Sequence, residues 1–308
     1  MKFPSPSSGE AVVAATDLSR RFGSKTVLDG VSLYVPKGCV FGLVGENGAG
    51  KTTLIKHILG LLDAETGTVR VFGRDPVADP VGVLGRIGYL SEQPDLPGWM
   101  RVDDLLRYSK AFYPKWDKAY AEKMLVEFGL NPAQRVSTLS KGQTAKAGLL
   151  IAQAHRPELL LLDEPSSGLD PIVRHEILEA VIRTVADEGR TVFFSSHLLE
   201  EIERVSDHIA MLARGKMVFF GSLDEIKLKH RRFTLRFENA REKPPVIAGA
   251  VSVCGNGKEW TVICNGANRR KLRLRSRRVS QGQVVIGQAY PHFHVGRARG
   301  LRSLQIVL

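Results

Sequence analysis

The sequence predicts an α/β fold in which a mixed sheet core carries an inserted helical subdomain and is followed by a small basic C-terminal appendage. Three observations predict this fold. Short apolar runs alternate with longer helical patterns at 11–228, and a mostly helical stretch at about 91–155 interrupts them. After residue 260, basic residues occur without acidic ones. We therefore expect a flexible N-terminus at 1–10, a main domain at 11–228 and the appendage at 229–308.

Five segments of the main domain have the pattern of β-strands. Residues 31–35 alternate between apolar and polar side chains, as a half-buried strand does. Residues 39–44 are almost continuously apolar, which is typical of a strand buried on both faces. The runs at 159–162, 191–194 and 209–212 are also short and apolar, so we expect further strands of the same sheet there.

The helices are predicted from periodicity and from residues suited to helix ends. Segments 102–112, 117–128 and 140–154 have a helical pattern and make up the expected helical subdomain. Asp170 is placed to cap a later helix that begins at Pro171, where the missing N–H of proline costs nothing. Beyond these helices, alternation at residues 233–237 predicts a strand that opens the appendage.

The composition is that of a globular protein in a reducing compartment. Hydrophobic residues make up 43% of the chain and charged residues 25%. No stretch of about 18 residues is apolar without charges, so we expect no membrane-spanning helix. The first ten residues lack the apolar stretch of a secretory signal. Cys39, Cys254 and Cys264 lack metal-site spacing and are odd in number, which indicates a cytosolic protein.

The positive charge of the chain is concentrated at its C-terminal end. The formal net charge is +12, from 44 Lys and Arg against 32 Asp and Glu. Residues 260–308 hold ten of the bases and none of the acids, which leaves 34 bases against 32 acids in residues 1–259. The first 259 residues are therefore nearly neutral, and the positive charge belongs to the tail.

A glycine-rich turn between an expected strand and an expected helix matches the pattern GxxxxGK[ST] of a phosphate-binding loop. Glycines let successive backbone N–H groups turn inward around phosphate oxygens. We expect Lys51 to contact the β- and γ-phosphates of a nucleotide and the Thr52 hydroxyl to bind Mg²⁺. The candidate phosphate-binding residues are Gly45, Glu46, Asn47, Gly48, Ala49, Gly50, Lys51, Thr52 and Thr53.

Two carboxylates follow the apolar run at residues 159–162. Asp163 is placed to hold Mg²⁺ through water, and Glu164 to accept a proton from an attacking water molecule. An Asp-Glu pair after a strand is by itself more often a solvated strand end or a helix cap. The phosphate-binding loop about 110 residues earlier favours the catalytic interpretation.

The segment Leu139-Ser-Lys-Gly-Gln143 opens an expected helix. The simplest interpretation makes Ser140 the N-cap of that helix. The same geometry also suits a phosphate, because a hydroxyl and free N–H groups meet at a helix N-terminus. On this second interpretation the phosphate-binding residues are Ser140, Gly142 and Gln143.

These motifs, taken in order, resemble the ATP-binding cassette of ABC transporters. The phosphate-binding loop is followed by Leu-Ser-Lys-Gly-Gln, by Leu-Leu-Asp-Glu-Pro165, by Ser167-Gly-Leu-Asp-Pro171 and by Ser195-Ser-His197. The resemblance covers about residues 11–228, and the ordered set is far more specific than any single motif. It implies a P-loop NTPase cassette that hydrolyses ATP with Mg²⁺, with Lys51, Glu164 and His197 as catalytic residues.

The resemblance also assigns roles to residues that carry no motif of their own. Phe22 matches the aromatic residue that stacks on adenine, although a loop aromatic that covers the core is the alternative. His197 matches a histidine that contacts the γ-phosphate, and a structural histidine at a strand end is the alternative. Asp170 lies in the segment that faces a partner subunit in this family, a role compatible with capping its own helix.

This sequence departs from the family pattern at two places. The family motif usually reads Leu-Ser-Gly-Gly-Gln, and Lys141 stands where the first glycine is expected. Because Ser140 and Gly142 are retained, we expect phosphate contact to be kept, with the lysine pointing away or pairing with nucleotide. The second departure concerns the glutamine that approaches Mg²⁺ or water. Gln93 has the expected type, whereas spacing favours Glu92, and both remain candidates.

The resemblance implies partners as well as a reaction. A second cassette is expected to form a head-to-tail dimer in which Ser140 and Gly142 act on the ATP bound by the other copy. Separate integral membrane subunits are expected to carry an unidentified cargo, with the cassette at the cytoplasmic face of the membrane. The stretch Phe112-Tyr-Pro-Lys-Trp-Asp117 and the helical region most resemble bacterial exporter cassettes. The alternative is a soluble cassette ATPase that acts on nucleic acid or ribosomes.

Three features oppose that alternative. Soluble cassettes typically carry a coiled-coil insertion, a zinc insertion or two cassettes in one chain, and this sequence has none of these, so nucleic acid is not an expected partner.

The basic tail leaves three hypotheses open. The tail run at 269–278 is interpreted as a solvated or disordered face, as a site for nucleic acid or anionic lipid, or as an altered reading frame after about Cys264.

Overall fold

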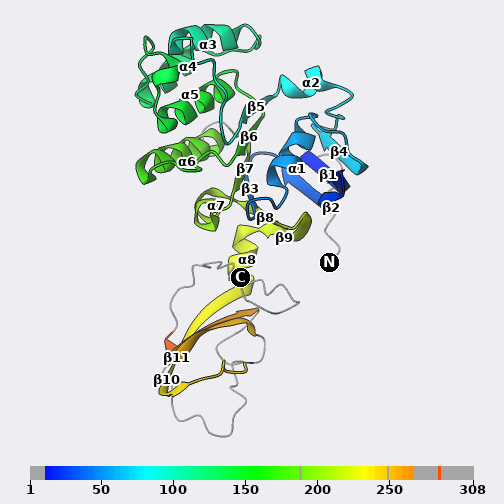
Figure 1. Ribbon diagram of the computed structural model, residues 1–308, viewed down its shortest axis with the longest axis vertical. Coiled ribbons are helices and arrows are strands. Elements are labelled where there is room, and N and C mark those ends of the chain that lie inside the picture. Colours follow the sequence, from blue (N-terminus) through cyan, green and yellow to red (C-terminus); the bar gives the residue numbers. More distant parts are fainter. Residues whose placement is uncertain (1–10, 187–188, 248–249, 266–283, 286–308) are drawn as a thin grey trace. The chain divides into compact units, whose positions relative to one another are not determined.

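The computed structural model contains two compact units, Met1–Gly221 and Ser222–Leu308. The structure describes residues 11–186, 189–247, 250–265 and 284–285 (Figure 1). The N-terminus predicted to be flexible and the basic run at 269–278 lie outside these residues, so the hypotheses about them stay predictions.

A six-stranded sheet forms the centre of the first unit, with strand order β5-β6-β7-β3-β8-β9. Its strands are β3 (Val40–Val44), β5 (Ile87–Leu90), β6 (Leu159–Asp163), β7 (Thr191–Ser196), β8 (His208–Ala213) and β9 (Lys216–Ser222). The pairs from β5 through β8 are parallel. The two-residue turn Arg214-Gly215 joins β8 to β9, and both of its residues have positive φ, as in the tight turns of hairpins. The predicted mixed sheet is confirmed.

A second sheet packs around the first helix of this unit. Its order is β2-β1-β4, and both pairs are antiparallel. The elements are β1 (Ala11–Phe22), β2 (Lys25–Pro36), β4 (Thr66–Val71) and the helix α1 (Lys51–Ile58). One buried cluster contains side chains from both sheets and from α1, including Phe41, Leu54 and Phe193. The helix thus lies in the core between the two sheets, and its N-terminus follows β3 directly.

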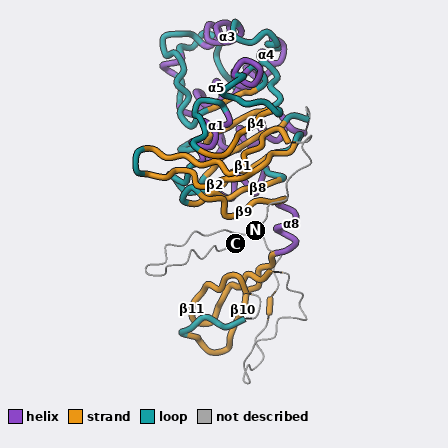
Figure 2. Tube along the Cα trace, turned by 90° about the vertical axis from the view of Figure 1, so that its right-hand side faces the viewer, coloured by secondary structure: helices purple, strands orange, loops and turns teal. Residues whose placement is uncertain are grey.

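The helical subdomain gathers at one end of the first unit, where Figures 1 and 2 place α3, α4 and α5 together. Its elements are α3 (Val102–Lys110), α4 (Lys118–Glu127), the 3₁₀ turn η1 (Val136–Thr138) and α5 (Lys141–Ala154). The remaining helices of this unit are α2 (Pro80–Leu84), α6 (Pro171–Ala186) and α7 (Leu199–Val205). In Figure 1, α6 and α7 cover the face of the central sheet opposite α1. The inserted helical block is confirmed.

The second unit has a small core of its own. It contains α8 (Leu223–Lys229), β10 (His230–Arg241), β11 (Ala250–Asn265) and β12 (Val284–Val285), with the sheet order β11-β10-β12. Leu235, Ile247, Trp260 and Val262 are buried together.

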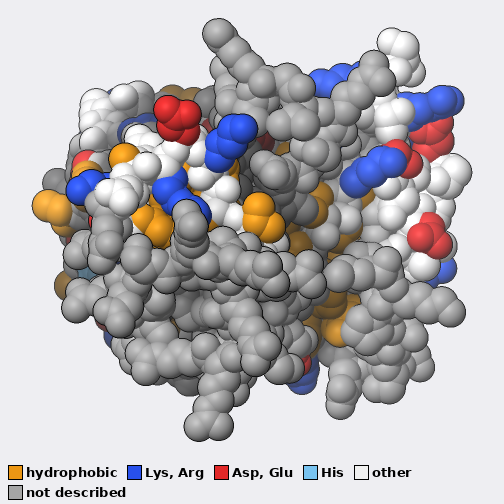
Figure 3. Space-filling model, turned by 90° about the horizontal axis from the view of Figure 1, so that it is seen from below, with side chains coloured by type: hydrophobic (Ala, Val, Ile, Leu, Met, Phe, Trp, Pro, Cys, Tyr) orange, Lys and Arg blue, Asp and Glu red, His pale blue; other side chains and the backbone are white. Residues whose placement is uncertain are grey.

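On the face drawn in Figure 3, the described basic side chains are interspersed with acidic and apolar ones. Within the described residues, no helix is both long and apolar enough to cross a membrane.

The order of the central sheet determines where polar groups meet. Strands β6, β7 and β3 are adjacent and parallel, so their carboxyl ends lie side by side. Asp163 pairs with Ser195 across β6 and β7, and Val44 pairs with Ser196 across β3 and β7. Segments more than 100 residues apart in the chain are therefore brought to one edge, where ligands bind in open α/β sheets.

Candidate nucleotide-binding site

The loop between β3 and α1 has the backbone of a phosphate cradle. Gly48 and Gly50 have φ values of 80° and 110°, which side chains other than glycine rarely adopt. A Cβ atom on Gly45 would lie 2.5 Å from the carbonyl oxygen of Leu212, so glycine is needed there for close packing. The loop ends at Gly50, the N-cap of α1. The cradle therefore presents the N-terminus of α1, which favours an anion.

Lys51 lies inside this cradle rather than in solvent. Its Nζ donates to the carbonyl oxygens of Gly45 at 2.6 Å and Glu46 at 3.1 Å. It also lies 3.0 Å from Oε1 of Glu164, and both side chains are buried. Because its ammonium is buried and already contacts oxygen atoms, Lys51 is positioned to bind the oxygen atoms of a ligand.

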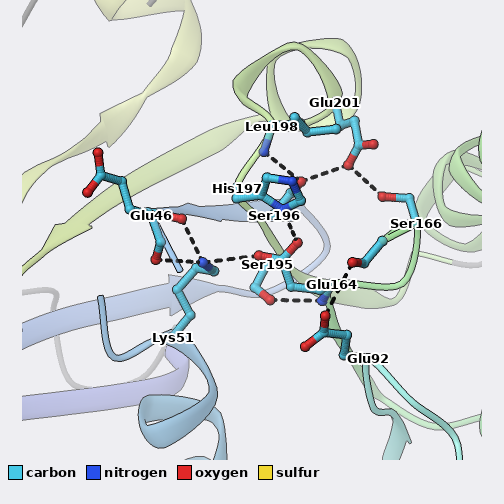
Figure 4. A network of polar contacts seen from close by, with 12 residues as sticks. Glu46, Lys51, Glu92, Glu164, Ser166, Ser195, Ser196, His197, Leu198 and Glu201 are labelled. Atoms are coloured by element: carbon cyan, nitrogen blue, oxygen red, sulfur yellow. Dashed lines mark hydrogen bonds and ion pairs between the residues drawn. The ribbon is translucent and has the colours of Figure 1, made fainter. Parts of the chain in front are cut away.

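Glu164 is held in an unusual conformation at the end of β6. Its φ is 50°, a left-handed value that costs energy for a residue with a Cβ. Its N–H is 3.1 Å from both the carbonyl oxygen and the Oγ of Ser195. Its Oε2 lies 2.7 Å from Nδ1 of His197. The three residues predicted to be catalytic are thus brought into direct contact, with Glu164 between Lys51 and His197 (Figure 4).

Asp163 is the other buried carboxylate at this strand end. Its Oδ1 accepts a hydrogen bond from Ser195 Oγ at 2.7 Å, and its side chain is also hydrogen-bonded to Thr52. Burial raises the pKa of Asp163 above its usual 3.8, while the hydrogen bonds from Ser195 and Thr52 act in the opposite direction. The structure thus joins two of the four residues predicted to bind Mg²⁺, while Glu92 and Gln93 remain the other candidates.

Magnesium fits the oxygen atoms that meet here. Mg²⁺ is usually bound by one or two carboxylates together with substrate phosphates and water. Thr52 and Asp163 supply a hydroxyl and a carboxylate in contact with each other. Across the described ranges, no cluster of three or more His, Cys, Asp or Glu side chains could hold a metal alone. The donor set therefore fits an ion shared with nucleotide phosphates.

The two candidates for the glutamine position differ in their contacts. Glu92 Oε1 accepts a hydrogen bond from Ser167 Oγ at 3.2 Å, which brings its carboxylate to the loop that follows Glu164. Gln93 accepts a hydrogen bond from Ser91 Oγ at 3.0 Å through its main-chain oxygen, and the side chains of both candidates are exposed. Figure 4 places Glu92 beside the Glu164 loop. The geometry therefore favours Glu92, in agreement with the spacing.

Ser140 caps α5, as its sequence position predicts. Ser140 Oγ accepts from the N–H of Gln143 at 3.2 Å, and the Gln143 side chain accepts from the N–H of Ser140 at 2.9 Å. This reciprocal pair is a capping box. Gly142 is buried against Val173, and a Cβ on Gly142 would lie 3.1 Å from the valine methyl carbons. Within the described residues, no hydrogen bond or ion pair joins Ser140 to Lys51 or Glu164.

Lys141, the departure from the family motif, extends over a neighbouring loop of the same chain. Its Nζ lies against Gly168, in the space that a Cβ there would occupy. Gly168 has a φ of 64°, so its backbone also favours glycine. The ammonium therefore lies over the segment between Glu164 and α6. The cap formed by Ser140 is retained beside it.

Phe22 lies apart from these contacts, at the end of β1. It pairs with Lys25 across the hairpin to β2, and its ring is 46% exposed. The guanidinium of Arg20 lies 5.0 Å from the ring centroid. Nearly half of Phe22 is exposed, and both interpretations of its role stay predictions.

A layer of polar contacts behind the site was not predicted from the sequence. Glu201 of α7 accepts hydrogen bonds from Ser166 and Ser196 (Figure 4). Ser166 is the second residue after Glu164, and Ser196 is the last residue of β7, directly before His197. Arg174 of α6 lies on the other oxygen of the same carboxylate. The one local signal was an acidic residue in the first turn of a helix, which is common and does not reveal burial.

Comparison with known proteins gives consistent matches. Residues 28–167 match the sequence profile of the ABC transporter family. The bacitracin transport ATP-binding protein BcrA of Enterococcus faecalis is 35% identical over 231 residues, which cover 73% of this chain and 74% of BcrA. The ABC transporter ATP-binding protein NatA of Bacillus subtilis is 34% identical, over 73% of this chain and 96% of NatA. A solved structure of an ATP-binding subunit of an ABC transporter has a TM-score of 0.65 at 31% identity, over 70% of this chain and 92% of that chain.

The mixed sheet, the glycine cradle and the buried Lys51 define a P-loop nucleotide-binding protein. More specifically, the chain belongs to the ABC transporter ATP-binding proteins, a family of ATPases. The resemblance inferred from its motifs is thereby confirmed, and the alternative of a soluble cassette acting on nucleic acid or ribosomes is not favoured. The dimeric cassette MJ0796, bound to ADP and phosphate, shares the fold at 20% identity and a TM-score of 0.62.

Proposed function

We propose that this chain hydrolyses ATP as one of two paired cassettes and drives export of a cargo through separate membrane subunits. The observation that carries this proposal is the contact of one buried carboxylate, Glu164, with both Lys51 and His197. This contact joins a cation suited to phosphate, a proton acceptor and an imidazole at the same edge of the sheet. Hydrolysis of a triphosphate needs positive charge near the phosphate oxygens and a group that takes a proton from water, and these three residues can supply both.

Lys51 is the residue that we assign to the β- and γ-phosphates. Its ammonium contacts Glu164 and two carbonyl oxygens in the cradle. Phosphate oxygens are stronger acceptors for these N–H groups than carbonyl oxygens are, because they carry charge. As Lys51 turns to the phosphates, its ion pair with Glu164 is lost and the carboxylate becomes free to bind water.

Glu164 then acts as the general base. It accepts a proton from the water that attacks the γ-phosphate, a step worth roughly 10²–10⁴ in rate. His197 donates Nδ1–H to Glu164, so its Nε2 is the atom directed to the phosphate. Charge on the phosphate is thus offset by Lys51 and His197 together.

Mg²⁺, when bound, neutralises phosphate charge and aligns the β- and γ-oxygens. Thr52 and Asp163 are the residues that we assign to it, and their mutual contact supports the assignment. Glu92 is assigned the position nearest the Glu164 loop, because its carboxylate is already joined to Ser167 there. Adenine is assigned to Phe22, whose exposed ring suits stacking on a base.

The second cassette completes the site in this proposal. Ser140 and Gly142 form the tip of α5, and no described contact joins Ser140 to Lys51 of its own chain. A two-fold dimer would place this tip on the nucleotide held by the other copy. The exposed side chain of Ile172, next to Asp170, supports this face as the one that meets a partner.

The membrane subunits are assigned to the helical subdomain. Trp99, Tyr108 and Phe112 are exposed there, and the rings of Tyr108 and Phe112 meet edge to face at 5.1 Å. Exposed aromatic residues mark surfaces that bind other proteins. The cassette is placed at the cytoplasmic face of the membrane. Relatives named for bacitracin transport support the assignment to export, and we assign recognition of the cargo to the membrane subunits.

The test is release of phosphate from ATP by the purified chain in the presence of Mg²⁺. We expect the rate per chain to rise with protein concentration and to level off as dimers form, because each site needs two copies. Absence of phosphate release at every protein concentration, both alone and with its membrane partner, would refute hydrolysis. A rate per chain that does not change with concentration would refute the paired site.

A further inference from the structure

We infer that Glu201 is a positioning residue that holds Glu164 and His197 in their reactive arrangement. This inference rests on the proposed function. Glu201 lies in the first turn of α7 and is only 5% exposed. A buried carboxylate is costly unless it is hydrogen-bonded or ion-paired, so its partners indicate what it does. None of the catalytic roles proposed above uses it.

One oxygen of Glu201 joins the two catalytic loops. Oε2 accepts a hydrogen bond from Ser166 Oγ at 2.6 Å and another from Ser196 Oγ at 2.7 Å. Ser166 is the second residue after Glu164, and Ser196 is the residue before His197. The carboxylate of Glu201 therefore ties together the segment that carries Glu164 and the segment that carries His197 (Figure 4).

The hydroxyl of Ser196 extends this hold to both sides of His197. Besides donating to Glu201, Ser196 Oγ accepts from the N–H of Leu198 at 3.0 Å. The residues before and after His197 are thus tied to one group. The direction of the imidazole toward Glu164 follows from this arrangement, because a side chain keeps its orientation only while its backbone is fixed.

The other oxygen of Glu201 reaches the segment before α6. Oε1 lies 3.2 Å from Nε of Arg174, and Nη2 of Arg174 donates to the carbonyl oxygen of Leu169 at 3.2 Å. Leu169 precedes Asp170, which caps α6 through its Oδ1. Glu201 therefore supports both ends of the loop from Glu164 to α6.

The conformation of Glu164 explains why such support is needed. Its left-handed φ of 50° is unfavourable for a residue with a side chain and persists only where the surroundings enforce it. The backbone bonds to Ser195 hold the start of the loop. The contacts of Glu201 hold the part that follows.

Only a carboxylate satisfies the three groups that converge on this position. Two hydroxyls donate hydrogen bonds to Oε2 of Glu201, and the guanidinium of Arg174 forms an ion pair with Oε1, so a negative charge and an acceptor are both needed here. Glutamine has almost the same volume but offers one acceptor oxygen and an NH₂ group. In Glu201→Gln, the amide must therefore give up either both serine contacts or the contact with Arg174.

The test compares Glu201→Gln with a matched control in the full chain. We measure kcat and KM for ATP hydrolysis, the Kd for a non-hydrolysable ATP analogue, and the thermal midpoint. Glu179→Gln on α6 is the control, since that carboxylate is exposed and pairs with His175 at 3.0 Å. The double variant Ser166→Ala/Ser196→Ala removes the two hydroxyl donors and leaves Glu201 in place.

We expect Glu201→Gln to lower kcat about tenfold or more while the analogue Kd stays within about twofold, since the cradle around Lys51 is not touched. The double serine variant should lower kcat in the same way, and the control should leave it unchanged. The inference is overturned if kcat of both variants stays within about twofold of the parent, or if kcat and analogue binding fall in equal proportion. Lack of hydrolysis in the parent chain would instead refute the proposed function.

Discussion

The ammonium of Lys51 lies 3.0 Å from Oε1 of Glu164, with both side chains buried. The other oxygen of Glu164 lies 2.7 Å from His197. While the lysine contacts this carboxylate, one of its oxygens is occupied and is not available to a water molecule. Binding of phosphate by Lys51 would therefore both position the substrate and release the base that takes a proton from the attacking water.

Replacement of Glu164 by glutamine should separate binding from hydrolysis. The amide keeps the shape of the side chain but cannot take a proton from water, so we expect turnover to fall by about 10²–10⁴. Nucleotide binding should be kept or strengthened, since Lys51 no longer pairs with a carboxylate. Phosphate release and size-exclusion chromatography with ATP should show an inactive dimer. Near-normal turnover would remove Glu164 from the role of base.

Lys51→Ala should abolish nucleotide binding and also weaken the fold. Removing one member of a buried ion pair leaves the other charge uncompensated, which costs on the order of 3 kcal/mol. Titration with a fluorescent ATP analogue measures the first effect, and urea denaturation the second. The double variant Lys51→Ala/Glu164→Gln should regain much of the lost stability. An alanine variant that binds the analogue like the parent would contradict the assignment.

The stability of the chain should carry a pH dependence from Asp163. Burial raises its pKa in the folded state above the usual 3.8, so the folded chain binds this proton more tightly than the unfolded chain. The contribution is fully present below pH 3.8 and is lost as pH rises through the raised folded pKa. Asp163→Asn should therefore have a higher thermal midpoint than the parent at neutral pH without Mg²⁺. Equal midpoints at neutral pH would contradict this account.

Mixing two inactive variants should restore activity if the α5 tip acts in trans. In a dimer of Lys51→Ala with Ser140→Ala, one site combines the intact lysine of one chain with the intact serine of the other. We expect the mixture to regain at most a quarter of the parent rate, because half the dimers are mixed and each has one intact site. Phosphate release from the two variants, alone and mixed, measures this. A mixture no faster than the separate variants would show that Ser140 acts within its own chain.

Glu92 and Gln93 should differ in their effect on the metal. Because Glu92 is joined to Ser167 beside the site, Glu92→Gln should raise the Mg²⁺ concentration needed for half-maximal hydrolysis. Gln93→Ala is the matched comparison and should change that concentration little. The rate is measured against Mg²⁺ at a fixed ATP concentration. The opposite ranking of the two variants would assign the position to Gln93.

The sequence predicted the catalytic residues, but not the residue that holds them in position. Glu164 and His197 directly follow strands, and Lys51 begins α1 after the loop that follows β3. Adjacent parallel strands bring these segments together. Glu201 could not be found in this way. Its partner Ser166 is 35 residues away, and only the packing of α7 against the sheet brings the two into contact.

The strand β1 shows why some elements were missed. Its pairing with β2 shifts register repeatedly between Ala11 and Arg21, and Asp17 within it has a φ of 47°. Each bulge reverses which side chains face the core, so the alternation of apolar residues is broken along the strand. Bulged strands and the glycine-interrupted β11 therefore carry no regular pattern from which they could be predicted.

The N-cap formed by Ser140 also bears on how two cassettes would associate and dissociate. Its oxygen accepts from the amide of Gln143, whereas none of the described hydrogen bonds uses the hydroxyl hydrogen as a donor. A terminal phosphate could take that hydrogen without unwinding the first turn of α5. The first turn of α5 would then stay folded through each cycle of dimer association and dissociation, so no free energy would be needed to refold it between turnovers.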